Sequence, residues 1–147
     1  MRPLTNNKKF PGSARPKNSN LPPLGIDLIE IKKAKSFYAA NQRYLGSFFS
    51  DREIRYIRGG KRPYVKLAVL LAAKEAVFKA MRKDWMGTEG FRKINIVPAG
   101  CKNFTFRLKG DFSEIFLNEA KLKGSFSENK DYVVARLSVA LGLDRKI

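Results

Sequence analysis

Hydrophobic and polar residues alternate along residues 24–31, and this spacing predicts the first β-strand of the chain. Residues 1–23, in front of it, contain five prolines among many Asn, Ser and Lys residues. A segment of this composition cannot bury enough apolar surface to fold. We therefore expect a disordered basic extension over residues 1–23 and a single folded domain over residues 24–147.

Helical spacing follows the first strand. We expect a short helix from about Ser36 to Leu45. A second helix should begin at Ser50, because Ser50 and Glu53 stand at the two positions of a capping box. A third and longer helix is expected over residues 64–83, where apolar residues run almost all the way round the helix axis. A helix of that kind is normally buried, so we expect it at the centre of the fold.

Strand spacing returns in the second half of the chain. Residues 94–97 and 104–109 alternate as two strands, and residues 125–128 and 132–139 as two more. Between these pairs, residues 113–123 have the pattern of a helix that ends at a glycine. Helices followed by a mainly antiparallel sheet predict an α+β domain, with the sheet packed on the long central helix.

The net charge of +17 is large for 147 residues, and only five of these charges belong to residues 1–24, which leaves +12 on the folded part. A hydrophobic content of 44% argues for a folded protein. The charge has two interpretations. It can reflect solubility alone, or attraction to an acidic protein, a nucleic acid or an anionic membrane surface.

The chain contains no histidine and a single cysteine, Cys101. Histidine-ligated metals and Ser-His-Asp triads are therefore excluded, and acid–base chemistry must fall to carboxylates, lysine, tyrosine or metal-bound water. One cysteine cannot form an internal disulfide, which fits a reducing cytoplasm. The longest apolar run is too short and too charged to cross a bilayer, so we expect no membrane segment.

Two carboxylates lie among apolar neighbours, Asp27 in the first strand, on the face that carries Ile29, and Glu75 in the long helix. A buried carboxylate must either become neutral or find a cation. Lys79 follows Glu75 by one helical turn, and Arg82 continues the same stripe, whereas Asp27 has no basic neighbour in sequence. If folding joins the two acids, they would form an oxygen-ligand site for Mg²⁺ beside substrate phosphates. The alternatives are a strand acid turned to solvent and an ordinary helical ion pair.

Three segments then point to a family. Residues 25–31 (GIDLIEI), 48–53 (FFSDRE) and 72–80 (AAKEAVFKA) resemble the corresponding motifs of the 4′-phosphopantetheinyl transferases. The similarity is greatest to the small holo-(acyl-carrier-protein) synthase type, and it extends from about residue 24 to residue 139 in the order and spacing of that family.

The resemblance implies a reaction as well as a fold. A member of this family moves 4′-phosphopantetheine from coenzyme A to a serine of an acyl carrier protein and releases adenosine 3′,5′-bisphosphate. By analogy, Asp27 and Glu75 would hold the Mg²⁺ ion, and Glu75 and Lys79 would be the catalytic residues. Lys79 corresponds to a lysine that touches a phosphate.

The resemblance also implies binding partners and an assembly. Lys33 and Arg43 fall where family members use basic residues of the first helix to bind the acidic carrier protein, although both also fit a solvated helix face. The coenzyme would contact Lys79, Arg82, Ser125 and Ser127. The expected assembly is a homotrimer with each active site shared between neighbouring subunits, located in the cytoplasm.

This chain departs from the family pattern in three places. Leu70 replaces an arginine within the long helix, and Gly87-Thr88 is shifted from the position of the usual Gly-Thr-Gly loop. Glu128 replaces a histidine that lies near the coenzyme in the family. A glutamate there would repel phosphate unless a base such as Arg82 or Lys130 neutralises it. We expect Glu128 to pair with such a base rather than to accept a proton from the carrier serine.

Two other functions are compatible with the sequence. A catalytically impaired homologue could still bind a carrier protein. The high charge and the Phe-Thr-Phe-Arg segment at residues 104–107 would also suit a nucleic-acid-binding module. The chain has no recognised nucleic-acid-binding signature, and paired buried acids would oppose a phosphate-binding face. We therefore expect no nucleic-acid partner.

Overall fold

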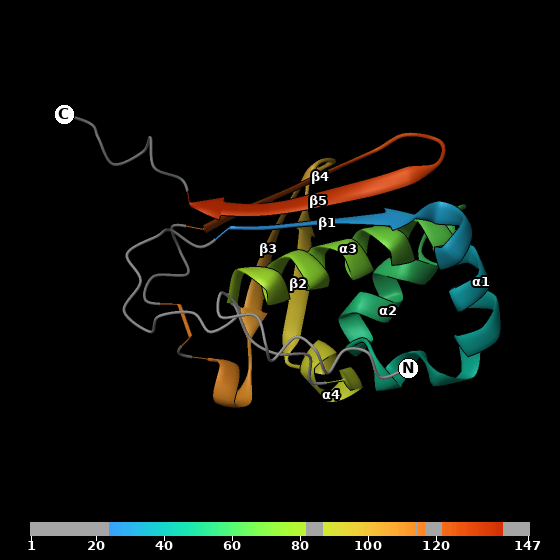
Figure 1. Ribbon diagram of the computed structural model, residues 1–147. Coiled ribbons are helices and arrows are strands. Elements are labelled where there is room, and N and C mark those ends of the chain that lie inside the picture. Colours follow the sequence, from blue (N-terminus) through green and yellow to red (C-terminus); the bar gives the residue numbers. More distant parts are fainter. Residues whose placement is uncertain (1–23, 82–86, 114, 117–121, 140–147) are drawn as a thin grey trace, which may run out of the picture.

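The computed structural model describes residues 24–81, 87–113, 115–116 and 122–139 (Figure 1). The elements, in chain order, are β1 (Gly25–Glu30), α1 (Ile31–Asn41), the 3-10 segment η3 (Gln42–Ser47), α2 (Asp51–Arg58), α3 (Pro63–Met81), α4 (Gly87–Arg92), β2 (Ile94–Ala99), β3 (Asn103–Leu108), the 3-10 turn η4 (Gly110–Phe112), β4 (Leu122–Glu128) and β5 (Tyr132–Val139). The strands form one antiparallel sheet in the order β1-β5-β4-β3-β2. The predicted α+β class is confirmed.

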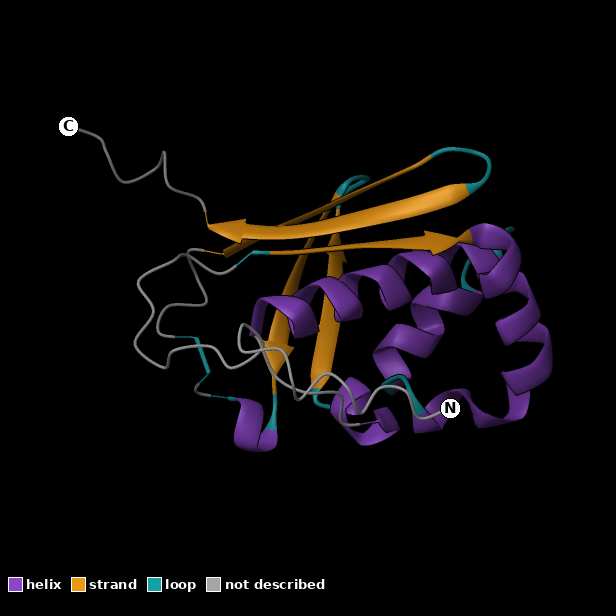
Figure 2. Ribbon diagram, viewed as in Figure 1, coloured by secondary structure: helices purple, strands orange, loops and turns teal. Residues whose placement is uncertain are grey.

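The long helix α3 lies at the centre of the protein, as its all-round apolar pattern predicted. It packs beneath β1 and β5, and the other described helices lie on the same side of the sheet (Figure 2). Leu67, Leu70 and Val77 of α3 are completely buried, as are the inward-facing Val133 and Leu137 of β5. This contact between helix and sheet forms most of the hydrophobic core.

Strand β1 approaches α3 so closely that only glycine fits at its start. A Cβ atom at Gly25 would lie 1.8 Å from the carbonyl oxygen of Ala76, far inside any normal contact. The other face of β1 is open, since Ile26 is 50% and Leu28 56% exposed. Asp27 alternates with these two residues and therefore faces α3.

The capping box predicted at the start of α2 is confirmed. The Ser50 hydroxyl accepts a hydrogen bond from the Glu53 amide at 3.1 Å. In return, the Glu53 carboxylate accepts one from the Ser50 amide at 2.9 Å. Gly59 follows directly as the C-cap of α2.

Two helix predictions were wrong in part. Helix α1 begins at Ile31, directly after β1, and not near Ser36. The helix predicted over residues 113–123 is absent from the described part of that range. Leu122 and Lys123 instead belong to β4, where they pair with Val139 and Ser138 of β5. Hydrogen bonding to a neighbouring strand has overridden a local helical preference there.

None of the helices in the described part of the chain is both long and apolar enough to span a membrane. The basic extension predicted for residues 1–23 lies outside the described residues, as do residues 82–83, the expected end of the long helix.

Candidate active site

The two acids singled out by the sequence lie on facing elements, Asp27 on β1 and Glu75 on α3. Gly25 makes this possible, because it allows β1 to contact α3 at Ala76, the residue next to Glu75. The Lys79 ammonium lies 2.8 Å from a carboxylate oxygen of Asp27 and donates to the Ile26 carbonyl at 3.4 Å. The lysine expected to pair with Glu75 therefore forms its salt bridge with Asp27, 52 residues away in sequence.

The electrostatics of Glu75 show that the acids are close enough to interact. Burial raises the pKa of the Glu75 carboxyl, the negative charge of Asp27 raises it further, and Lys79 acts in the opposite direction. One lysine thus serves two carboxylates. A site with this excess of negative charge attracts a second cation.

The same two acids fit the ligand preferences of Mg²⁺, which usually takes one or two protein carboxylates and completes its shell with water and substrate phosphates. Among the described residues, no group of three or more Asp, Glu or Cys side chains gathers at one point. Asp27 and Glu75 would therefore be the two protein ligands of such an ion. The Lys79 side chain is 54% exposed, so it can turn from Asp27 toward a bound phosphate.

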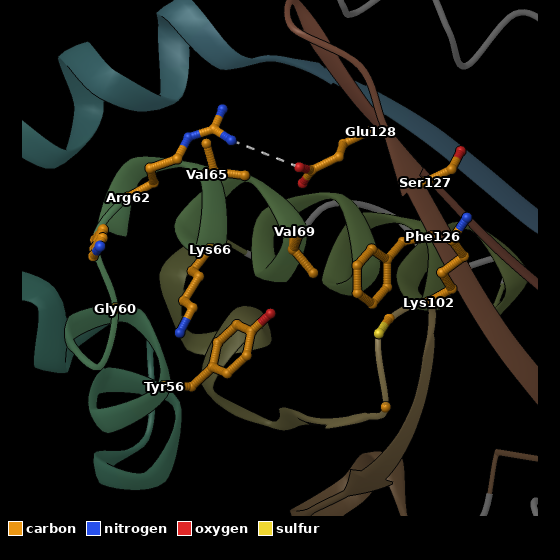
Figure 3. Close-up of a pocket in the computed structure, with 13 residues that line it drawn as sticks. Tyr56, Gly60, Arg62, Val65, Lys66, Val69, Lys102, Phe126, Ser127 and Glu128 are labelled. Atoms are coloured by element: carbon orange, nitrogen blue, oxygen red, sulfur yellow. Dashed lines mark ion pairs between the residues drawn. The ribbon is translucent and has the colours of Figure 1, made fainter.

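A large pocket of about 760 Å³ opens beside the first half of α3, which contributes Val65, Lys66 and Val69 to its lining (Figure 3). Its walls come from the end of α2, the start of α3, the β2–β3 turn and the end of β4. Four cationic side chains line it, together with two aromatic rings: Lys61, Arg62, Lys66 and Lys102, with Tyr56 and Phe126. Cations beside aromatic rings suit a phosphorylated nucleotide.

Sequence reasoning missed these pocket cations. Lys61 and Arg62 stand together just before α3, and that basic pair was the available signal. Lys66 and Lys102 are 36 positions apart in the numbering and meet only through the fold.

Glu128 belongs to this pocket and not to the pair of acids. Its carboxylate lies 3.9 Å from the Arg62 guanidinium (Figure 3). It also raises the pKa of the Tyr56 hydroxyl, although burial contributes more to that shift. Glu128 therefore pairs with a base, as expected, and that base is Arg62. Arg82, one of the two bases considered from the sequence, lies outside the described residues.

The remaining predicted residues are dispersed in a single chain. Ser125 and Ser127 alternate with the inward-facing Phe126, so they lie on the outer face of the sheet, away from Lys79. There they line a groove of about 370 Å³ that also includes Arg136. Ser127 additionally lines the basic pocket beside α3, next to Glu128 (Figure 3). Arg82 and the side chain of Thr88 lie outside the described residues.

The two predicted carrier-binding residues are both exposed. Lys33 lies on α1 at the edge of an apolar groove of about 450 Å³, which Phe37 and Leu71 help to line. Arg43 lies in η3, directly after α1. Leu70, which stands where the resemblance leads us to expect an arginine, is completely buried.

Comparisons with known proteins agree on one family. The sequence profile of the 4′-phosphopantetheinyl transferase superfamily matches residues 23–137. A protein of Chloroherpeton thalassium named holo-[acyl-carrier-protein] synthase is 33% identical over 113 residues, which cover 76% of this chain and 92% of that protein.

Solved structures of the same kind share the fold. A holo-[acyl-carrier-protein] synthase from Neisseria meningitidis has 24% identity and a TM-score of 0.65, and the match covers 79% of this chain and 95% of that one. A Chronobacterium ammoniagenes ACPS–CoA complex has 24% identity and a TM-score of 0.66, with coverage of 82% and 97%.

Proposed function

The chain belongs to the 4′-phosphopantetheinyl transferase superfamily, and we propose that it transfers 4′-phosphopantetheine from coenzyme A to a serine of an acyl carrier protein. The observation that carries this proposal is the convergence of Asp27 and Glu75 on one lysine between β1 and α3. In the reaction, the serine oxygen forms a bond to phosphorus. The phosphoanhydride bond breaks, and adenosine 3′,5′-bisphosphate leaves.

The chain's own residues would supply positioning and charge. Asp27 and Glu75 would hold Mg²⁺, which when bound neutralises negative charge on the pyrophosphate. Lys79 would bind a phosphate oxygen, a charge-assisted contact worth roughly 1.5–3 kcal/mol. Burial and the charge of Asp27 raise the pKa of the Glu75 carboxyl, so Glu75 is the better candidate to accept the serine proton.

We assign the nucleotide end of coenzyme A to the basic pocket beside α3. Its four cations suit the phosphates of adenosine 3′,5′-bisphosphate, and Tyr56 and Phe126 offer faces for a purine ring. Lys66 and Glu75 are nine residues apart on α3, about two and a half turns, so they lie on opposite sides of the helix. One coenzyme molecule cannot easily reach both sites of a single chain.

This separation supports an active site shared between subunits of a homotrimer. The pocket of one chain would then face the acid pair of its neighbour. The uncovered apolar face of β1 offers a surface for that contact, since Leu24, Ile26 and Leu28 are each at least half exposed. Ser125 and Ser127 lie on this same outer face of the sheet, where a neighbour's coenzyme would be within their reach.

Mass spectrometry of an apo acyl carrier protein tests the proposal. Incubation with this protein, coenzyme A and Mg²⁺ should increase the carrier mass by one phosphopantetheine group, and a chelator should prevent the increase. An unmodified carrier would contradict the proposed activity. If the carrier still bound tightly, the catalytically impaired homologue would be the better description.

A further inference from the structure

Glu53 and Lys74 are the only charged side chains that are fully buried in the described part of the chain, with exposures of 1% and 0%. The Lys74 ammonium lies 3.0 Å from the Glu53 carboxylate. It also donates to the carbonyl oxygens of Phe91 at 2.7 Å and Ile94 at 2.5 Å. These three acceptors match the three N–H groups of an ammonium.

The Glu53 carboxylate is equally well satisfied. One oxygen accepts from the Ser50 amide at the start of α2, and the other accepts from the Ile96 amide of β2 at 2.7 Å. Burial lowers the pKa of Lys74 to about 8, while Glu53 opposes this shift, so the charged form prevails at neutral pH. The pair therefore joins α3 directionally to three other elements, α2, α4 and β2.

A buried ion pair is a poor source of stability, because desolvation of the two charges offsets much of their attraction. Its hydrogen bonds, which are directional, instead constrain the orientation of α3. Helix α3 is apolar almost all the way round, with thirteen buried residues, and hydrophobic contact is non-directional. Apolar packing alone therefore leaves the rotation of α3 about its axis weakly determined. The three contacts of the Lys74 ammonium, by contrast, can all form at only one rotation of the helix.

We propose that the Glu53–Lys74 pair is a positioning device that fixes the rotation of α3 and thereby holds Glu75 toward Asp27. The inference rests on the proposed function, in which these two acids bind the metal ion. Glu75 directly follows Lys74, and Ala76 contacts Gly25 of β1, so a rotation that released Lys74 would also move Glu75 relative to β1. A displacement of about 1 Å can reduce the rate of such a reaction about 100-fold.

The test compares three variants of the full chain. Lys74→Met removes the ammonium and keeps much of its apolar volume. Glu53→Gln combined with Lys74→Met leaves no unpaired buried charge, so it should recover much of the thermal stability that the single variant loses. Val133→Ala truncates the core of β5 without touching the pair, and it serves as the control for general destabilisation.

Mn²⁺ affinity, measured by electron paramagnetic resonance with and without coenzyme A, is the first readout. We expect both Lys74 variants to bind Mn²⁺ at least ~10-fold more weakly and to lose ~100-fold in kcat, with KM for the carrier changed less than ~3-fold. Val133→Ala should retain Mn²⁺ affinity and kcat. Equal losses in Val133→Ala, or full activity in the double variant, would overturn the proposal.

A crystal structure of the double variant decides the question independently of activity. The positioning role requires a rotated α3, with Glu75 displaced relative to Asp27, and an unchanged arrangement would disprove it. Failure of the proposed function looks different, since the wild type would then bind Mn²⁺ without modifying the carrier. The Mn²⁺ affinities and the crystal structure would still decide the role of the pair.

Discussion

Asp27 and Glu75 share a single lysine, so the ionisation of Glu75 is costly in the folded protein. Its pKa is raised in the fold, chiefly by burial and then by Asp27. A carboxyl with a raised folded-state pKa contributes stability that is present below its unfolded pKa, near 4.5. That contribution disappears as the pH rises through the folded-state value. At neutral pH the metal-free protein therefore carries an unfavourable charge at Glu75.

Glu75→Gln should therefore stabilise the metal-free protein at pH 7 while abolishing transfer. Because Glu75 is about half buried and solvent weakens the effect, we expect a rise in Tm of about 1–3 °C. The gain should vanish at pH 4, where the wild-type carboxyl is protonated. Thermal denaturation in a chelator at both pH values measures this. Glu128→Gln is the control with a more exposed carboxylate, and a Tm gain that is the same at pH 4 would contradict the explanation.

Glu128 stands where the resemblance leads us to expect a histidine, and its contact with Arg62 predicts a modest role. Glu128→Gln should change kcat less than ~3-fold, because the side chain pairs with a base in the pocket. It should lower KM for coenzyme A, since a negative charge is removed from a phosphate-binding surface. Steady-state kinetics measure both. A fall of ~10²-fold in kcat with intact coenzyme binding would instead identify Glu128 as a proton acceptor.

For individual residues, the sequence identified the candidate reactive side chains but not the side chains with which they pair. Asp27, Glu75 and Lys79 stand out because charged residues interrupt apolar runs, and such interruptions are costly without a reason. The salt bridge from Lys79 to Asp27 spans 52 residues and depends on how β1 approaches α3. The burial of Lys74 was equally invisible, since a lysine next to a glutamate on a helix usually points to solvent.

Helix α1 and the η3 segment after it present the surface that is expected to meet the acidic carrier protein. Lys33→Glu and Arg43→Glu should each raise KM for the carrier about 5-fold or more at low salt, with little effect on KM for coenzyme A. Higher ionic strength should reduce the difference from wild type, because salt screens exposed charges. Kinetics at two salt concentrations measure this.

Lys109→Glu provides the matched control for α1. It makes the same charge change at an exposed position beyond β3, away from this helix. If Lys109→Glu raised KM for the carrier as much as Lys33→Glu, net charge and not a docking surface on α1 would explain the effect. If Lys33→Glu on α1 and Arg43→Glu on η3 both impaired coenzyme binding as much as carrier binding, the fold would be damaged.

Helices marked by capping residues or by a strong apolar pattern could be predicted from the sequence. Segments whose structure depends on pairing with a distant strand could not. The Ser50–Glu53 capping box and the all-round apolar pattern of α3 marked two helices correctly. Residues 122–123 have a helical pattern in sequence, yet they extend β4 because β5 offers a full ladder of hydrogen bonds. Local spacing contains no information about such a distant partner.

The distribution of sites over the whole molecule leads to the last prediction. Lys66 of the basic pocket points away from Glu75 on α3, and a shared active site would join the pocket of one subunit to the acids of the next. Asp27→Asn damages only the acid side. A double variant, Arg62→Ala with Lys66→Ala, damages only the pocket. Each protein alone should be inactive or nearly so.

Co-expression of the two proteins in equal amounts should restore activity. Random assembly places intact acids against an intact pocket in about one quarter of sites, so about a quarter of wild-type activity is expected in the carrier mass assay. Asp27→Asn co-expressed with Glu75→Gln is the matched control, because both acids of a site come from one chain and no intact pair can form. No recovery in the test mixture would show that each chain builds its active site alone. Recovery in the control would show that the two acids of one site come from different chains.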